Sequence, residues 1–238
     1  MKYMKYMKYM KYIIILFIII SFLFFRNVNE KFNNNNEEYI EIKYPLKYEI
    51  INNFINKEDI KYIITKCKNY LKRSTIANFD SEITSWRTSK TAFINNILGS
   101  NDPVLKKIIN KVTKLENIKP EYIEEINLTY YKEGNQYKQH HDYYNPKSNP
   151  TEEYILKNSG QRMKTIFVYL KNAIEGGETN FPIEKKKFKL KEGDAIMWEN
   201  GFKENNIYYM NYNSLHEGLP PKKGEKYGLN IWIKNKPR

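Results

Sequence analysis

The sequence predicts an α+β protein that is mainly β, with a double-stranded β-helix (jelly-roll) core and an N-terminal helical layer. Before residue 120, hydrophobic residues recur in two segments with the spacing of amphipathic helices. After residue 120, short segments rich in β-branched and aromatic residues are separated by Gly, Pro and Asn, as strands are. Helices followed by many short strands favour a helical layer that supports a double sheet.

The N-terminus has the pattern of a secretory signal. Residues 1–12 repeat Met-Lys-Tyr and are followed by Ile13–Phe25, an apolar stretch broken only by Ser21. Residues 1–26 are therefore predicted to be a signal-anchor or a signal peptide. The sequence Phe24-Phe25-Arg26 offers no small-residue cleavage site, which favours an uncleaved anchor.

The apolar stretch leaves two alternatives open. As a helix it spans roughly 20 Å, short of the ~30 Å of a bilayer core, so a cleaved signal or an ordinary buried segment also fits. The lysines before it predict that the rest of the chain crosses the membrane. We therefore expect the endoplasmic reticulum or another secretory-pathway membrane, with the main domain on the lumenal side.

A polar, low-complexity stretch, residues 27–39, is predicted to be a flexible linker. The single domain that follows, 40–238, divides into helical support (40–120) and jelly-roll core (121–238). A strand is expected at Ile40–Ile51 and a helix at Lys57–Leu71, after an Asn56 cap.

The order of the remaining elements follows from the same patterns. Residues 78–94 are expected to be loop-rich, and Asp102-Pro103 to start a second helix that runs through Leu115. The predicted strands are Glu125–Tyr131, Tyr137–Tyr144, Met163–Leu170, Phe188–Leu190, Ala195–Trp198, Ser214–Gly218 and Tyr227–Ile233.

Composition restricts the function only weakly. The formal net charge is +13, but the basic residues are mostly scattered lysines. These lysines either form a solvated surface or attract an acidic partner, which could be nucleic acid or an anionic membrane. No basic run shows the aromatic stacking platform that favours single-stranded nucleic acid. Cys67 is the only cysteine, which excludes an intrachain disulfide.

The most informative motif is His140-His141-Asp142, because the chain has only three histidines. In a strand, His140 and Asp142 point to one face and His141 points to the other. Together with a distant histidine, His216, they would form the facial triad that suits non-haem Fe(II) and leaves coordination positions open. A ligand set that uses His141 in place of His140 is the alternative, but it puts adjacent residues on opposite faces.

Six ordered motifs resemble those of the prolyl 4-hydroxylases, Fe(II)- and 2-oxoglutarate-dependent dioxygenases. They are Tyr131–Asp142 (Y-x-x-G-x-x-Y-x-x-H-x-D), Arg162–Leu170, Gly176–Pro182 (GGET-x-FP), Lys191–Trp198, Leu215–Gly218, and Gly224–Lys226 with Trp232-Ile233. Asn53–Ile55 and Arg87–Ser89 match the family's helical region more weakly. The resemblance covers Pro45 to Lys234.

The resemblance implies roles for single residues. His140, Asp142 and His216 would bind Fe(II), and Lys226 would pair with the distal carboxylate of the co-substrate 2-oxoglutarate, which is costly to bury without a cation. Tyr131 and Thr179 would lie near that co-substrate; Tyr131 could instead be core. O2 is the second co-substrate, and ascorbate is expected as a further cofactor. A carboxylate at Asp142 favours hydroxylation over halogenation.

Substrate contacts are less defined. Arg87, Glu124 and Arg162 could line a peptide groove, although salt bridges or surface positions explain them equally well. Two Lys/Asn-rich insertions, Asn145–Gly160 and Phe202–Asn213, are expected to enlarge loops at the mouth of the site. They leave the identity of the substrate open.

The resemblance implies an enzyme that hydroxylates prolyl residues of a protein, similar to a procollagen-proline 4-dioxygenase, and releases succinate and CO2. The alternatives are the same chemistry on another substrate, such as alkylated nucleic acid, and a non-catalytic jelly-roll binding module. The expected partners are a proline-containing protein or peptide and, through the N-terminal segment, a membrane. Nucleic acid is not expected, and the oligomeric state stays open.

Overall fold

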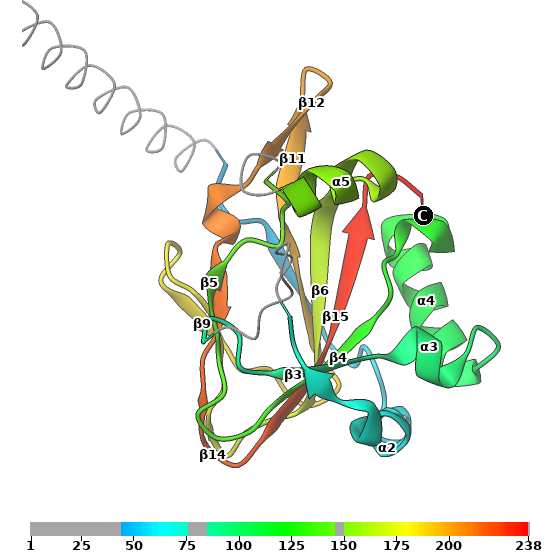
Figure 1. Ribbon diagram of the computed structural model, residues 1–238, viewed down its shortest axis with the longest axis vertical. Helices are drawn as coiled ribbons and strands as arrows, with labels where there is room; N and C mark the ends of the chain where they lie inside the picture. The colour runs from blue at the N-terminus through cyan, green and yellow to red at the C-terminus, as the bar shows by residue number, and fades with distance from the viewer. Residues whose placement is uncertain (1–43, 76–84, 146–149, 238) are drawn as a thin grey trace, which may run out of the picture. The chain divides into compact units, whose positions relative to one another are not determined.

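Two antiparallel sheets face each other in the computed structural model, which describes residues 44–75, 85–145 and 150–237 (Figure 1). The seven-stranded major sheet has the order β1 (Tyr48–Ile51), β10 (Ala195–Glu199), β6 (Arg162–Lys171), β15 (Lys226–Lys234), β4 (Asn127–Tyr131), β3 (Lys90–Phe93) and β2 (Lys72–Arg73). The four-stranded minor sheet has the order β5 (Tyr137–His140), β13 (His216–Gly218), β8 (Thr179–Phe181) and β9 (Lys186–Phe188). Two facing antiparallel sheets confirm the predicted jelly-roll class.

Helices cover the outer face of the major sheet. They are α2 (Lys57–Cys67), α3 (Ile94–Leu98) and α4 (Pro103–Glu116). The Asn56 side chain accepts a hydrogen bond from Asp59 N (2.8 Å) and so caps α2. Asp102 caps α4 in the same way, and Asn117, in the left-handed conformation (φ 51°), ends it. Both predicted helix starts are confirmed.

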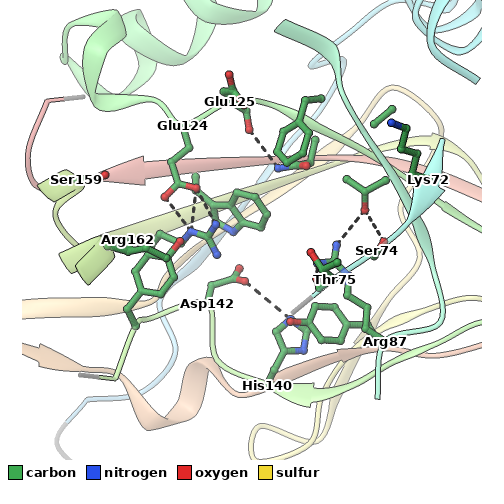
Figure 2. A pocket seen from close by; sticks show the side chains of 18 of the residues that line it. Lys72, Ser74, Thr75, Arg87, Glu124, Glu125, His140, Asp142, Ser159 and Arg162 are labelled. Atoms are coloured by element: carbon green, nitrogen blue, oxygen red, sulfur yellow. Dashed lines mark hydrogen bonds and ion pairs between the residues drawn. The ribbon is translucent and has the colours of Figure 1, made fainter. Parts of the chain in front are cut away.

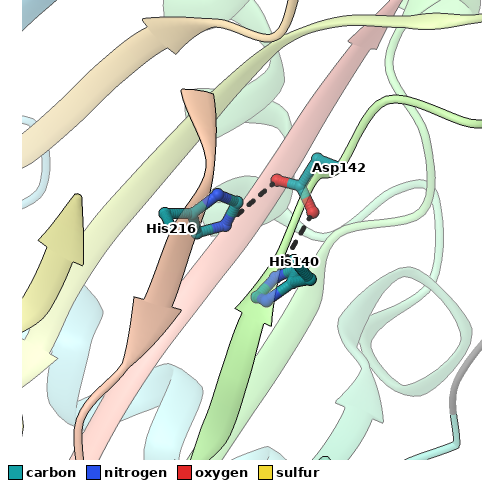
Figure 3. Close-up of side chains that lie close together, drawn as sticks. All are labelled: His140, Asp142 and His216. Atoms are coloured by element: carbon teal, nitrogen blue, oxygen red, sulfur yellow. Dashed lines mark ion pairs between the residues drawn. The ribbon is translucent and has the colours of Figure 1, made fainter. Parts of the chain in front are cut away.

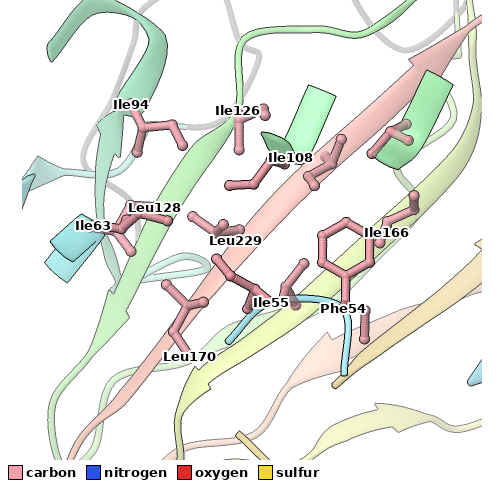
Figure 4. Close-up of a cluster of buried hydrophobic side chains, with 14 of the residues drawn as sticks. Phe54, Ile55, Ile63, Ile94, Ile108, Ile126, Leu128, Ile166, Leu170 and Leu229 are labelled. Carbon is pink, nitrogen blue, oxygen red and sulfur yellow. The ribbon is translucent and has the colours of Figure 1, made fainter. Parts of the chain in front are cut away.

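The alternation of β6 divides the core into two parts. Ile166, Val168 and Leu170 belong to the cluster that packs the helices against the major sheet (Figure 4). The intervening Phe167 and Tyr169 belong to a second cluster, between the two sheets. The inner face of the major sheet is therefore the face that can carry a site.

Several predicted boundaries were wrong. The strand expected at 40–51 is β1, which covers only Tyr48–Ile51 within the described part of that segment. The helix expected to reach Leu71 ends at Cys67 and continues as a short 3-10 turn. The loop expected at 78–94 contains β3 in its described part. Together β1, β2 and β3 show that the predicted helical support also supplies edge strands to the major sheet.

The two insertions are not simply larger loops. The first contains a helix, α5 (Pro150–Ser159), and the second contains a hairpin, β11 (Gly201–Glu204) with β12 (Ile207–Met210). The hairpin extends beyond the sheets in Figure 1. A further short pair, β7 (Glu175–Gly176) with β14 (Pro221–Lys223), also went unpredicted. Strands this short carry too few residues to show an alternating pattern.

The predicted anchor (1–26) and linker (27–39) lie outside the described residues. Within the three described ranges, no helix is both long and apolar enough to cross a bilayer. Residues 46–238 form one compact unit, so the helical layer and the two sheets belong together.

Candidate active site

The two predicted metal-binding histidines lie opposite each other on neighbouring strands of the minor sheet. His140 ends β5, His216 begins β13, and the antiparallel register pairs them directly. The carboxylate of Asp142 lies 3.9 Å from His140 Nε2 and 3.7 Å from His216 Nε2 (Figure 3). One ligand atom from each residue lies within 4.8 Å of the other two. Strand register thus brings the two histidines together, and Asp142 reaches them from the segment that follows β5.

Main-chain carbonyls orient both imidazole rings. His140 Nδ1 lies 2.7 Å from the carbonyl oxygen of Lys138, and His216 Nδ1 lies 2.9 Å from that of Ser214. These contacts favour a hydrogen on Nδ1 and leave Nε2 to bind a metal. Burial and the neighbouring His216 hold the pKa of His140 well below its usual range, so its ring is neutral, as a metal ligand must be.

His141 is not part of this cluster. Its Nε2 lies 3.1 Å from the carbonyl oxygen of Tyr212. The predicted strand Tyr137–Tyr144 is too long, because β5 ends at His140 and Asp142 lies in the bend that follows. The bend, rather than strand alternation, returns Asp142 to the side of His140.

Asp142 is a buried carboxylate that stays ionised. Burial alone would raise the pKa of this carboxyl group, but His216, His140, Arg162 and a hydrogen bond from Thr165 together hold it well below its usual range. Thr165 Oγ1 donates to Asp142 Oδ2 over 2.7 Å. Two imidazoles with available Nε2 atoms and one ionised carboxylate are a donor set that fits Fe(II).

A narrow pocket leads from these three residues to Lys226. Its wall includes all three and also Lys226 and Thr179. Strand β15 explains the placement, because Lys226 and Trp232 lie an even number of residues apart and so face the same interior. The pocket thus has a metal site and a buried cation among its lining groups.

Lys226 has few polar partners. Its side chain is almost fully buried, and within the described ranges it makes no ion pair and one long hydrogen bond, 3.5 Å to Thr179 Oγ1. Its ammonium lies 4.7 Å from the ring centre of Phe167 and 5.3 Å from that of Tyr169. Burial lowers the pKa of Lys226 to about 7. A bound carboxylate would supply the close ion pair that no described residue makes with Lys226.

The predicted co-substrate residues Tyr131 and Thr179 lie beside this lysine. Tyr131 on β4 pairs with Lys226 in the strand register, and its ring centre lies 5.7 Å from the ammonium. Tyr169 donates to Thr179 Oγ1 over 2.9 Å, which orients that hydroxyl. Contact of Tyr131 and Thr179 with 2-oxoglutarate stays a prediction.

The Phe167 ring, which lies near Lys226, occupies the space above Gly228, so any side chain at residue 228 would collide with this ring.

A wide groove of about 1070 Å³ is lined by two of the three predicted metal-binding residues, His140 and Asp142. It shares four residues with the narrow pocket: Tyr137, His140, Asp142 and Trp232. Helix α5, from the first insertion, contributes Glu152, Ile155 and Ser159 to its wall. The narrow pocket and the groove therefore meet at the metal site.

All three predicted substrate-binding residues line this groove (Figure 2). Arg162 donates to both carboxylate oxygens of Glu124 (2.7–3.1 Å), and its guanidinium lies 3.7 Å from the ring centre of Trp232. Glu124 also pairs with the buried Lys234 at 3.3 Å. Arg87 lies over the ring of Tyr137 at 4.6 Å. The salt bridge weighed as an alternative exists, and it forms part of the groove wall.

Sequence reasoning missed the residues that support the site. Thr165 contacts Asp142, and Asn200 Nδ2 in turn donates to Thr165 Oγ1 over 2.8 Å. Tyr137 stacks on His140 with ring centres 3.4 Å apart. The parity of β15 could have placed Trp232 on the same face of the sheet as Lys226. No signal in the sequence identifies Asn200, since its role depends on a residue of another strand.

Comparisons with known proteins agree with this geometry. Residues 126–234 match the 2OG-Fe(II) oxygenase superfamily. A protein of Acanthamoeba polyphaga mimivirus named as a prolyl 4-hydroxylase is 30% identical over 192 residues, which cover 79% of this chain and 74% of that protein. Prolyl 4-hydroxylase 5 of Arabidopsis thaliana is 26% identical over 222 residues, 84% of this chain and 72% of the plant protein.

A solved structure is similar over the same region. The viral collagen prolyl hydroxylase of Paramecium Bursaria Chlorella virus-1, in complex with 2OG, superposes with a TM-score of 0.59 at 28% sequence identity. The match covers 79% of this chain and 95% of the viral one.

Proposed function

This chain belongs to the prolyl 4-hydroxylases of the 2OG-Fe(II) oxygenase superfamily, and we propose that it hydroxylates prolyl residues of a polypeptide at C4. One oxygen atom of O2 enters the prolyl C–H bond as a hydroxyl group. The other enters 2-oxoglutarate, which loses CO2 and leaves as succinate. Atoms and electrons balance without a further reductant.

The observation that carries this proposal is the junction of the narrow pocket with the groove. The pocket offers a buried cation, Lys226, to a small dianion, and the groove offers room for a larger molecule. Both reach His140 and Asp142, so two reactants of different size can meet at one metal.

His140, Asp142 and His216 would bind Fe(II). Bound Fe(II) supplies the activation of O2 that couples decarboxylation of 2-oxoglutarate to hydroxylation. Lys226 would bind the distal carboxylate, with Thr179 and Tyr131 close to it. The hydrophobic wall of Phe167 and the neighbouring rings excludes water and strengthens that ion pair.

The groove suits a peptide with a proline. Tyr137 and Trp232 line both cavities, so their rings lie where the reacting residue must reach the metal. Proline-rich segments dock well in grooves lined by aromatic rings. Arg162, Glu124 and Arg87 lie along the wall and would contact main-chain groups of the same peptide.

The proposal also includes ascorbate as a further cofactor and a location in the secretory pathway. Ascorbate would restore Fe(II) after turnover that is not coupled to substrate. Residues 1–26 would place the domain in the lumen of the endoplasmic reticulum or a related compartment, as an anchor or a cleaved signal; the lysine-rich N-terminus supports this.

Mass spectrometry of proline-rich peptides tests the activity. The protein, loaded with Fe(II), is incubated with 2-oxoglutarate, ascorbate and a proline-rich peptide. We expect a mass increase of one oxygen atom on proline, together with succinate, and neither with Asp142→Ala. Succinate formation that depends on a methylated oligonucleotide, with no change in any peptide, would favour the nucleic-acid alternative.

Carbonate washing and N-terminal sequencing test the location. An anchor predicts a membrane-bound protein that begins at Met1 or Lys2, and a cleaved signal predicts a start near Asn27. Recovery only from the cytosol would contradict both.

A further inference from the structure

Hydrogen bonds, together with the covalent frame of the residues that make them, connect Asp142 to His216 through the protein interior. Thr165 Oγ1 donates to Asp142 Oδ2 (2.7 Å), and Asn200 Nδ2 donates to Thr165 Oγ1 (2.8 Å). The main-chain carbonyl of Asn200 accepts from Asn211 N (2.9 Å). The path therefore leaves one metal-binding residue and runs toward the segment that carries the other.

Ser214 completes the path. Its hydroxyl donates to the carbonyl oxygen of Asn211 over 2.6 Å, and its own carbonyl lies 2.9 Å from His216 Nδ1. Thr165, Asn200 and Ser214 are fully buried. Hydrogen bonds shielded from water in this way are strong and fix a single geometry.

The direction of each bond follows from the chemistry. The ionised carboxylate of Asp142 can only accept, so the Thr165 hydroxyl must donate to it. That hydroxyl then accepts from an N–H group, which fixes the Asn200 amide with its nitrogen toward Thr165. The amide oxygen, Asn200 Oδ1, has no hydrogen-bond partner among the described residues.

The unpaired buried oxygen of Asn200 lowers the stability of the fold, so a contribution to stability does not explain why this residue is an asparagine. Asn200 lies between β10 of the major sheet and the β11–β12 hairpin, and its bond with Asn211 closes the base of that hairpin. Its side chain thus reaches the Asp142 side of the site, while its main chain is tied to the segment that leads to His216.

We propose that Asn200 is a positioning residue that fixes Asp142 and His216 relative to each other through this network. The inference rests on the metal site of the proposed function. It assigns to Asn200 no contact with substrate, and it predicts that the ligands are preorganised before the metal binds.

Binding of Co(II) alone to the metal-free full chain, followed by its visible absorption, tests the proposal. Asn200→Leu and Thr165→Val keep side-chain shape and remove the polar groups. Loss of such outer partners typically weakens metal binding about 10–100-fold, and we expect this of both variants, with an altered Co(II) spectrum. Thr165→Ser keeps the hydroxyl and should bind Co(II) like the parent.

Stability separates positioning from a purely structural role. Asn200→Leu removes the unpaired oxygen, so the metal-free variant should melt at or above the temperature of the parent. The double variant Asn200→Leu with Thr165→Val should bind Co(II) no more weakly than the weaker single variant, since both act through one path. Asn172→Leu is the control: that amide bonds the carbonyl of Leu190, outside the network.

Three results would overturn the proposal: parent-like Co(II) affinity in both single variants, fully additive losses in the double variant, or a loss of affinity matched by a loss of metal-free stability. A parent that binds no Co(II) would refute the metal site itself and, with it, the proposed function. Parent-like variants of a Co(II)-binding protein would leave the proposed function intact.

Discussion

The two ends of the narrow pocket differ in how the protein satisfies their polar groups. At the metal end, His140, Asp142 and His216 each have a hydrogen-bond partner within the protein, at 2.7–2.9 Å. At the other end, Lys226 has one hydrogen bond at 3.5 Å and is otherwise surrounded by aromatic rings.

The difference shows which end is complete before a ligand arrives. The fold orients His140, Asp142 and His216, so binding of a metal there would require little rearrangement. Lys226 makes no ion pair within the described ranges, and the attraction of Glu178 does not offset burial, which lowers the pKa of Lys226 to about 7. The polar groups of the candidate metal end are satisfied within the protein, whereas the lysine end would be completed by the proposed co-substrate.

Removal of a metal-binding residue should have the largest effect. His140→Ala, Asp142→Ala and His216→Ala should each abolish 2-oxoglutarate turnover, because two remaining ligands do not retain Fe(II). Succinate release and bound iron are the measurements. His141→Ala, whose ring points toward Tyr212, should keep much of the activity. Equal loss in that variant would contradict the assignment of the ligands.

Truncation of Lys226 should act at the opposite end alone. Lys226→Ala leaves a buried carboxylate unpaired, at a cost of about 2–5 kcal/mol, so 2-oxoglutarate affinity should fall roughly 30- to several-thousand-fold. Calorimetric titration of the metal-loaded protein measures the affinity for 2-oxoglutarate. The affinity for the metal should not change.

Lys226→Arg should restore part of the affinity for 2-oxoglutarate. The controls are Lys222→Ala and Lys223→Ala, two exposed lysines of β14, and both should have little effect.

The affinity for 2-oxoglutarate should depend on pH through Lys226. Free Lys226 loses its proton above about pH 7, and binding of the dianion requires the charged form. The apparent affinity for 2-oxoglutarate should therefore be constant below pH 7 and fall by about tenfold per unit above it, until the pKa of the complex is reached. Dissociation constants measured between pH 6 and 9 test this. Arginine stays charged over this range, so Lys226→Arg should remove the pH dependence. A parent protein whose affinity for 2-oxoglutarate does not change with pH would contradict the prediction.

The smallest expected effect is on stability. Lys226 has a lower pKa in the folded protein than in the unfolded chain, so its burial disfavours folding most below pH 7 and progressively less up to its unfolded pKa of about 10.4. Lys226→Met should raise the melting temperature of the co-substrate-free protein, by about 2–4 °C per kcal/mol of relief, and the gain should shrink as pH rises from 7. A lower melting temperature at pH 7 would show that the ammonium is better satisfied than its contacts indicate.

The sequence by itself determined the fold class and both helix starts, and it predicted the metal-binding residues and Lys226, whose roles stay predictions. The helix starts and the spacing of His140 and Asp142 follow from local information. A cap is set by neighbouring residues, a strand face by alternation, and the motif by short spacings such as His140-x-Asp142. The resemblance extended this local information to the distant His216 and Lys226.

Only the tertiary structure decided how the site is supported and bounded. Arg162 pairs with Glu124 across 38 residues, and Asn200 reaches Thr165 across 35. The bend after His140 returns Asp142 to the metal side, and the hairpin and α5 replace the expected loops. These contacts depend on sheet register and on the close approach of separate strands, and residue periodicity along one segment does not encode either.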